Sequence, residues 1–497
     1  MPEILETYGN VTIVDIGSGN LPLYSLKIPN LTNDEKSVIE NPKKLVALAD
    51  IDKLDAMSFT KRDKFLRQKI KEKIIEALDS GKNIKPENME ILISLAISEF
   101  YGYDVIGPLM EDDRLEEVMV NGVNLPIIVF HRSHGMCTTN LGFKDRESLN
   151  GVINKIAEYA GRRISKNEPL LDAQLPDGSR SNVAIPPAAP KGPVITIRKF
   201  RAEPFSIIDL IIVKTITVEL AAFLWTAVEG FGISPINMLI TGGAGSGKTT
   251  TLNSLGTFIP LHERIVTVED TMELNFDFTD NWVPLEATPS VIKESTIDTE
   301  ALMKNTLRMR PDRVIVGEVR GAEAVTLFVA MDIGLNGSMG TIHANNSREC
   351  AIRLEDPPMS VPLMMLPLLD LIVVQNRIFA PGKGVIRRIT EVTEVGGVQN
   401  KVLQLGEIYK WDQETDEIKR TPYPVLMKEK LAKNAGMSKL EFEEELKDRQ
   451  RVLQYLVDNN IRANDAVIDY VRRYRVDKKS VMEEMGPEDL YEIPGKK

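Results

Sequence analysis

The chain has 497 residues, 43% of them hydrophobic and 27% charged, and a formal net charge of −11. One domain usually holds roughly 100–200 residues, so we expect several domains with real hydrophobic cores. The acidic balance repels polyanions and argues against a nucleic-acid track across the surface. The two cysteines, Cys137 and Cys350, form no C-x-x-C pair, so neither a zinc site nor a disulfide framework is predicted.

No apolar stretch approaches the roughly 20 residues that a membrane-spanning helix needs. The amino terminus is acidic, with Glu3 and Glu6, and lacks the basic start and apolar core of an export signal. The sequence therefore predicts a cytoplasmic protein.

Hydrophobic periodicity and turn residues divide the chain into five regions. Residues 1–100 are expected to form a helical amino-terminal segment, because charged and apolar positions alternate at helical spacing from about residue 34. Short β-rich runs predict an α/β domain over 101–205, followed by a linker at 206–216. Alternating helix and strand patterns over 217–390 are typical of a doubly wound parallel sheet, and 391–497 reads as polar strands and a charged helical tail. The predicted fold class is α/β, with a parallel-sheet core, a smaller α/β amino-terminal domain and helical segments at both ends.

A phosphate-binding motif lies at the start of the predicted core. The apolar run 238–240 leads into a full G-x-x-x-x-G-K-[ST] match, and a helical pattern follows it. Backbone N–H groups of such a loop wrap phosphate oxygens, the lysine meets the β and γ phosphates, and the threonine hydroxyl binds Mg²⁺. A glycine-rich turn before a helix would leave the lysine unexplained. The residues predicted to bind the nucleotide are Gly242, Gly243, Ala244, Gly245, Ser246, Gly247, Lys248, Thr249 and Thr250.

Three further strand-like runs end in polar side chains: Glu269 with Asp270, then Glu318, then His343. In an open parallel sheet the ligand lies beyond the carboxyl ends of the strands, so these groups can meet the phosphates. Glu318 is the candidate that polarises the attacking water. Glu269 either holds Mg²⁺ through water or orients the nucleophile, unless it is a helix-capping acid.

His343 either senses the γ-phosphate or supports Glu318, unless it is a core histidine. Asp312 precedes its strand and so cannot hold the metal at the other end. No Asn-Lys-x-Asp segment for reading guanine occurs, which favours ATP as the nucleotide, with Mg²⁺.

These motifs resemble the type II and type IV secretion ATPase family, most closely the archaeal branch that drives archaella and related pili. The family's four boxes occur in order: the P-loop, an acidic box at 265–270, an aberrant Walker B at 313–320 and a histidine box at 340–345. The resemblance implies a RecA-like P-loop core that hydrolyses ATP. Its bacterial members often carry a four-cysteine zinc insert, which this chain cannot form.

The resemblance also extends upstream, to segments 107–109, 117–122, 175–180 and 195–199. It implies that Arg180 and Arg198 reach the nucleotide from the amino-terminal domain and act as a latch; the alternative is a surface basic pair. Arg308, Arg310 and Arg320 are further candidates for contacts with a nucleotide or a neighbouring subunit.

By the same resemblance the working form is a homohexamer docked on a polytopic membrane platform protein, where it drives filament or secretion machinery subunits. The sequence does not distinguish between archaellum rotation, pilus assembly, retraction and protein export, because relatives with these tasks share the same ATPase core. Two rivals are a RecA-like nucleic acid translocase and a nucleotide-binding scaffold without turnover. The net charge weighs against the first, and the combination of Lys248, Thr249 and Glu318 against the second.

Overall fold

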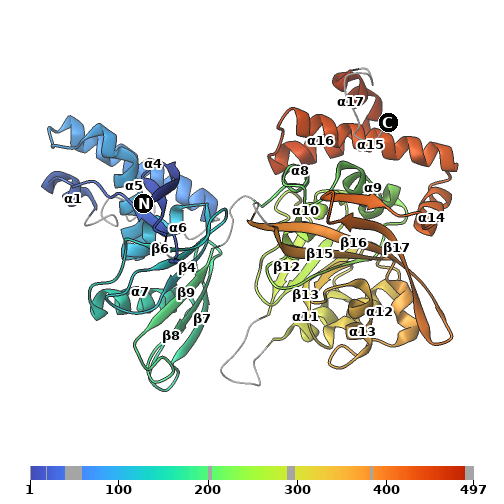
Figure 1. The fold of residues 1–497 in the computed structure, drawn as a ribbon, viewed down its shortest axis with the longest axis horizontal. Helices are drawn as coiled ribbons and strands as arrows, with labels where there is room; N and C mark the ends of the chain where they lie inside the picture. The colour runs from blue at the N-terminus through green and yellow to red at the C-terminus, as the bar shows by residue number, and fades with distance from the viewer. Residues whose placement is uncertain are drawn as a thin grey trace. The chain divides into compact units, whose positions relative to one another are not determined.

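The computed structural model describes residues 2–17, 19–39, 59–199, 204–287, 297–380 and 384–486. The chain divides into two compact units, residues 1–202 and 203–497, each with its own sheet and core (Figure 1). None of the helices in these described ranges is both long and apolar enough to cross a membrane.

The first unit is built on a nine-stranded sheet in the order β1-β2-β3-β6-β5-β4-β9-β8-β7. Only the β3–β6 pair is parallel among the strand pairs described for it. The strands are β1 (Glu3–Tyr8), β2 (Val11–Asp15), β3 (Leu23–Leu26), β4 (Leu115–Val120), β5 (Ile128–His131), β6 (Gly135–Thr139), β7 (Leu170–Gln174), β8 (Arg180–Ala184) and β9 (Val194–Arg198). The helices are α1 (Asn33–Ile39), α4 (Phe59–Asp79), α5 (Met89–Tyr101), α6 (Gly107–Glu111) and α7 (Arg146–Tyr159), with short 3-10 turns η1 (Pro86–Asn88) and η2 (Asp104–Ile106).

The assignment of residues 1–100 to a helical segment is wrong for their first part, because β1, β2 and β3 lie there. Val11 and Ile13 are buried on β2, and Tyr24 and Leu26 on β3. This spacing of two is the strand period, and it places one face of each strand on the core. Helices α4 and α5 lie within the predicted helical stretch, whereas residues 40–58 lie outside the described part.

The second unit carries a nine-stranded sheet in the order β12-β11-β13-β14-β10-β15-β16-β17-β18. The strands from β12 to β15 are parallel, and β15 to β18 form an antiparallel extension. Its strands are β10 (Met238–Thr241), β11 (Ile265–Glu269), β12 (Trp282–Glu286), β13 (Arg313–Val319), β14 (Met339–Ile342), β15 (Leu371–Ala380), β16 (Gly384–Gln399), β17 (Val402–Asp412) and β18 (Glu417–Arg420).

Both faces of this sheet are covered. On β10, Met238 and Ile240 belong to one buried cluster and Leu239 to another, since successive side chains of a strand point to opposite faces. One cluster joins α8 (Ile207–Ile212), α9 (Val218–Glu229), α10 (Lys248–Gly256), α14 (Leu426–Asn434), α15 (Lys439–Asp458), α16 (Asn464–Val476) and α17 (Lys478–Met485). The other joins α11 (Thr299–Thr306), α12 (Glu323–Asp332), α13 (Ser347–Glu355) and the 3-10 turn η5 (Leu363–Leu368). A further turn, η3 (Gly230–Gly232), follows α9. This double cover confirms the α/β class and a core built on a parallel sheet.

Two predicted boundaries differ from the structure. Residues 206–216 are not a linker, because Ser206 opens α8 with a capping box to Asp209, and Ile207, Ile208 and Leu210 are buried in the core. The boundary at 390/391 falls inside β16, which continues the same sheet. The strands beyond it therefore belong to the core, and the other boundaries within the two units stay predictions.

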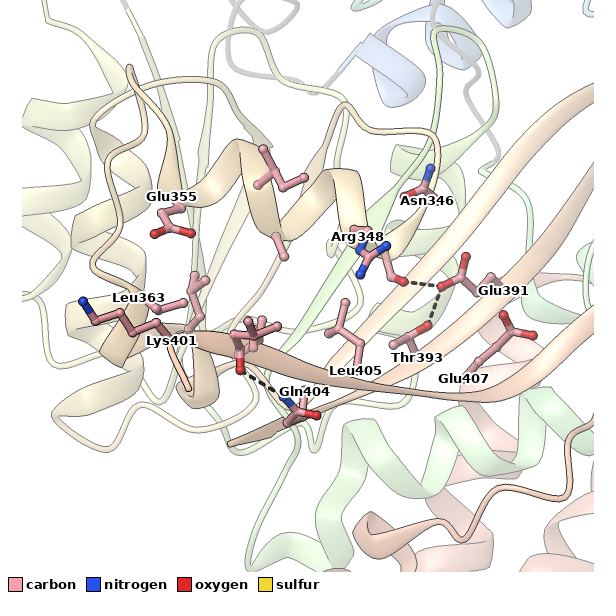
Figure 2. A pocket seen from close by; sticks show the side chains of 16 residues that line it. Asn346, Arg348, Glu355, Leu363, Glu391, Thr393, Lys401, Gln404, Leu405 and Glu407 are labelled. Carbon is pink, nitrogen blue, oxygen red and sulfur yellow. Dashed lines mark hydrogen bonds between the residues drawn. The ribbon is translucent and has the colours of Figure 1, made fainter. Parts of the chain in front are cut away.

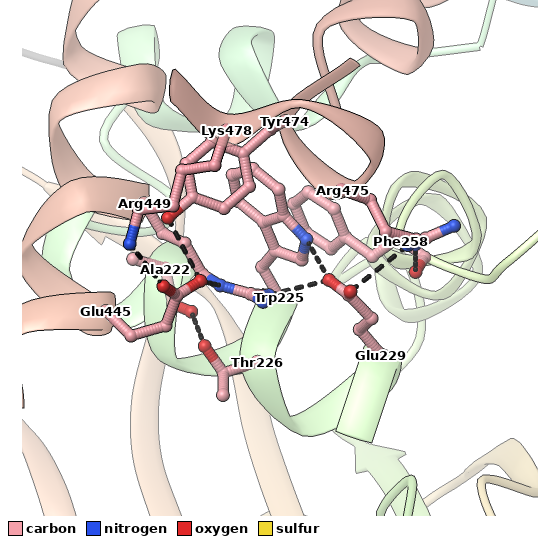
Figure 3. A network of polar contacts seen from close by, with 10 residues as sticks. All are labelled: Ala222, Trp225, Thr226, Glu229, Phe258, Glu445, Arg449, Tyr474, Arg475 and Lys478. Carbon is pink, nitrogen blue, oxygen red and sulfur yellow. Dashed lines mark hydrogen bonds and ion pairs between the residues drawn. The ribbon is translucent and has the colours of Figure 1, made fainter. Parts of the chain in front are cut away.

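The carboxy-terminal helices dock on α9 through a buried polar network, shown in Figure 3. Glu229 at the end of α9 accepts hydrogen bonds from Trp225 Nε1 (2.8 Å), Arg449 Nη1 (2.7 Å) and Arg475 Nε (3.1 Å). Arg449 also lies over the Trp225 ring, 4.8 Å from its centroid, and pairs with Glu445 through Nε at 3.0 Å. Charges this deeply buried are tolerated only when paired. The helical tail is thus part of the second unit's core.

Candidate functional site

The loop between β10 and α10 requires glycine at two of its positions. A Cβ on Gly242 would lie 2.0 Å from the carbonyl oxygen of Gln375, and one on Gly247 would lie 2.8 Å from Gln375 Nε2. Gly247 also has a φ of 94°, in the left-handed region that glycine adopts freely. Both glycines let the loop pass close to β15.

Helix α10 presents an open amino terminus to this loop. Its N-cap, Gly247, has no side chain to accept from the first N–H groups, which attract anions together with the helix dipole. Lys248 is buried, and its Nζ donates to the carbonyl oxygens of Gly242 (3.0 Å) and Gly243 (3.1 Å). The residues present fit a bound polyphosphate, because the N–H groups at the start of α10 and the positive charge of Lys248 lie at the same loop.

The strand ends expected to face the phosphates do converge at one edge of the sheet. β14 and β13 follow β10 in the sheet order, and Thr241 pairs with Ile342, which precedes His343. Lys248 Nζ lies 3.5 Å from His343 Nδ1, and His343 Nε2 lies 2.8 Å from Glu318 Oε1. The imidazole thus stands between the P-loop lysine and the carboxylate.

The charges around Lys248, His343 and Glu318 set the protonation states of the histidine and the glutamate. Burial raises the pKa of Glu318, but the hydrogen bond from Arg320 (2.5 Å) and the charges of Arg320, His343 and Lys248 outweigh it and hold that pKa below its usual value. Burial and the Lys248 charge lower the pKa of His343. At neutral pH, Glu318 is therefore ionised and His343 is neutral.

Glu269 lies one strand further from the P-loop and is 3% exposed. Its Oε1 accepts the backbone N–H groups of Glu273 (3.0 Å) and Leu274 (3.1 Å), which fix the carboxylate at the strand end. Thr249, in the first turn of α10, supplies a hydroxyl. A hydroxyl and a carboxylate are the hard oxygen donors that fit Mg²⁺.

The excluded Asp312 and the two predicted arginines of the first unit have defined places. Asp312 lies just before β13 and accepts the backbone N–H of Arg264 at 2.7 Å. Arg180 on β8 is directly opposite Arg198 on β9, so both lie on the same face of the first unit's sheet.

Sequence reasoning missed the residues that support the P-loop from β15 and β16. Gln375, 1% exposed, donates from Nε2 to the carbonyl of Ser246 (2.8 Å) and accepts from Thr251 Oγ1 (2.6 Å). Arg387 Nε donates to the carbonyl of Gly245 at 3.0 Å. Gln375 follows directly on the apolar run 371–374, so the strand-end argument applied to the other three runs would have found it.

A cavity of about 590 Å³ lies next to this region, between α13 and strands β16 and β17 (Figure 2). Within it, Glu391 Oε1 accepts from Thr393 Oγ1 at 2.6 Å and from the Ser347 hydroxyl. Its lining begins at Asn346, three residues after His343, and includes no P-loop residue. The cavity is therefore separate from the phosphate site.

Glu6, His131 and His134 in the first unit bring three potential metal-ligand atoms within 4.8 Å of one another. However, His131 Nδ1 accepts the backbone N–H groups of Ser133 (3.2 Å) and His134 (3.3 Å), and Glu6 pairs with Arg114. The Arg114 guanidinium bound to Glu6 repels a metal cation at the same carboxylate. Because Nδ1 of His131 already accepts hydrogen bonds, the ring proton is on Nε2, and neither nitrogen is available as a metal ligand. The cluster is built as an ion-pair network.

A P-loop between strand and helix, with polar strand ends beside it on a doubly wound sheet, defines a P-loop nucleoside triphosphatase. A family model described as type II/IV secretion system protein matches residues 103–380, more than half of the chain. The chain therefore belongs to the type II/IV secretion ATPase family, and it is an ATPase.

Individual proteins show the same likeness. An uncharacterized protein of Methanocaldococcus jannaschii is 30% identical over 93% of this chain and 89% of its own length. The conjugal transfer protein TrbB of Rhizobium radiobacter is 30% identical over 59% of this chain and 88% of its own. The crystal structure of the VirB11 ATPase from the Brucella suis type IV secretion system is 24% identical, covering 60% of this chain and 97% of that one with a TM-score of 0.30.

Proposed function

We propose that this protein is a motor ATPase that works as a homohexamer on the cytoplasmic face of a membrane and drives an archaellum- or type IV pilus-like filament, or a related secretion machine. A polytopic platform protein is the proposed receptor. The family match supports a motor for secretion or pili, and the resemblance of the boxes to the archaeal branch supports the filament.

The observation that carries the enzymatic part is the row Lys248–His343–Glu318, contributed by the start of α10 and by the ends of the neighbouring strands β14 and β13. Lys248 binds the β and γ phosphates, and Thr249 and Glu269 hold Mg²⁺. Glu318 orients the attacking water, because hydrolysis of a γ-phosphate needs an acceptor beside that water.

His343 couples the position of Glu318 to the presence of the γ-phosphate, since it contacts both Glu318 and the lysine that binds the phosphate. Arg180 and Arg198 are proposed as additional nucleotide contacts, and ATP hydrolysis as the source of mechanical work. No nucleic acid is required.

The test separates binding from turnover. Glu318→Gln should bind a fluorescent ATP analogue as the wild type does but release phosphate at least 100-fold more slowly, whereas Lys248→Ala should lose affinity as well. Glu300→Gln is the matched control, because Glu300 is a carboxylate on α11 that pairs with Lys304 at the surface. Near-normal turnover by Glu318→Gln contradicts its role, and native mass spectrometry with ADP that finds only monomers contradicts the hexamer.

A further inference from the structure

The β15–β16 hairpin continues past the end of the P-loop strand. Thr241, the last residue of β10, pairs with Val374, and β15 runs on to Ala380. Five residues beyond Gln375 span about 16 Å at roughly 3.3 Å each. The hairpin therefore forms a surface that leads away from the phosphate site.

One face of this hairpin is continuous with the P-loop. Gln375, Arg377 and Phe379 alternate along β15 and so point to the same face. Arg387 and Val385 lie directly opposite Arg377 and Phe379 on β16, which places them on that face too.

Contacts with the loop identify this face as the one that borders the nucleotide site. Gln375 bonds to the carbonyl of Ser246, and Arg387 to the carbonyl of Gly245. Arg377 is close by, since a Cβ on Gly245 would lie 3.7 Å from Arg377 Nη1. Moving outward from the loop, the face presents two guanidinium groups and then an aromatic and an aliphatic side chain.

The outer pair is exposed: Phe379 is 76% and Val385 44% accessible. A phenylalanine this exposed next to two arginines offers both a stacking surface and positive charge. Nucleic-acid bases stack on aromatic side chains, and arginine adds contacts to phosphate and to the base.

The sheet order fixes which part of a nucleotide comes to this side. The groups assigned to the γ-phosphate, His343 and Glu318, lie on β14 and β13, on one side of β10. β15 and β16 lie on the other side. We infer that a triphosphate whose γ end lies at Glu318 extends across the P-loop toward β15 and β16, which contact the loop on its other side.

We propose that this face of the β15–β16 hairpin, made of Arg377, Phe379, Val385 and Arg387, is the binding surface for the nucleoside part of the substrate. Phe379 stacks on the adenine base with Val385 beside it, and Arg377 and Arg387 contact the α-phosphate and ribose. This assignment rests on the proposed placement of the γ-phosphate at Glu318 and names the part of ATP that the P-loop does not bind.

The experiment compares two ligands that share phosphates but not a nucleoside. Calorimetric titrations of the full chain with ADP and with inorganic tripolyphosphate are run on the wild type, Phe379→Ala and Arg377→Met. Phe379→Ala should weaken ADP binding on the order of tenfold and leave tripolyphosphate binding unchanged. Arg377→Met should weaken ADP more than tripolyphosphate, and Arg377→Lys should recover part of the loss.

A second variant gives a direct readout of stacking. In Phe379→Trp, the fluorescence of the introduced indole should be quenched by ADP and not by tripolyphosphate. Met364→Trp is the control, in which neither ligand should quench the introduced indole. Met364, 77% exposed on η5, is an equally accessible apolar side chain away from the hairpin.

Three outcomes overturn the proposal: unchanged ADP affinity in Phe379→Ala, an equal loss for both ligands, or a change in oligomeric mass without a change in ADP affinity. The last would make the hairpin a contact between subunits. Loss of the water-orienting role of Glu318 is recognised separately, because it appears as normal turnover of Glu318→Gln and does not alter these titrations.

Discussion

Removing the charge of Glu229 should weaken the docking of the carboxy-terminal helices on α9. The Glu229 side chain is 6% exposed and is held between Arg449, 2% exposed, and Arg475 (Figure 3). Removing one member of a buried ion pair costs about 3–5 kcal/mol, because the other charge stays buried without compensation. Glu445 still pairs with Arg449 in this variant. Glu229→Gln should therefore lower the free energy of unfolding by an amount at the lower end of this range, about 3 kcal/mol.

Two measurements check this value in the full chain. Trp225, Trp282 and Trp411 are the chain's three tryptophans and all lie in the second unit, so their fluorescence during urea unfolding reports on that unit alone. Hydrogen exchange of α15 and α16 should be roughly 100-fold faster, since about 1.4 kcal/mol corresponds to a factor of ten.

The matched control is Glu484→Gln. Glu484 also pairs with an arginine of α16, Arg473, but both side chains are more than a third exposed. An exposed pair contributes about 0–1 kcal/mol. If Glu229→Gln and Glu484→Gln shift the urea midpoint equally, or if exchange in α15 is unchanged, the buried network does not hold the tail in place.

Two further predictions concern the catalytic edge. Gly317→Ala should lower kcat while ADP binding persists, because the added Cβ would lie 2.7 Å from Glu269 Cγ in a buried site, and such overpacking costs about 1–3 kcal/mol. The control is Gly397→Ala, which should have wild-type turnover because nothing lies within 4 Å of its added Cβ. Equal kinetics for both variants would refute the steric argument. Arg320→Met should shift the acid limb of the pH–rate profile to higher pH: with the guanidinium gone, the remaining burial raises the pKa of Glu318, so the carboxylate protonates earlier as the pH falls. An acid limb that does not move would show that Glu318 ionisation does not control turnover.

Much of the catalytic edge could be predicted from local sequence. The P-loop and the apolar runs before Glu269, Glu318 and His343 were recognisable because buried parallel strands are short and apolar and their carboxyl ends share one edge. The class of fold follows from the same alternation of strands and helices. The roles of these residues remain predictions, and so do those of Arg180 and Arg198.

Other features were decided only by the tertiary structure. The strand order determined that His343 lies between Lys248 and Glu318, because neighbours in a sheet are set by long-range pairing and not by chain order. Residues 206–216 resembled a linker, yet Ile207 and Ile208 are fully buried, and their helix α8 packs against α10 and α15, which come later in the chain. Sequence periodicity determines which face of an element is apolar. Which partner covers that face depends on contacts between distant segments. For this reason the contact of Arg387 with the P-loop and the docking of the carboxy-terminal helices became visible only in the folded chain.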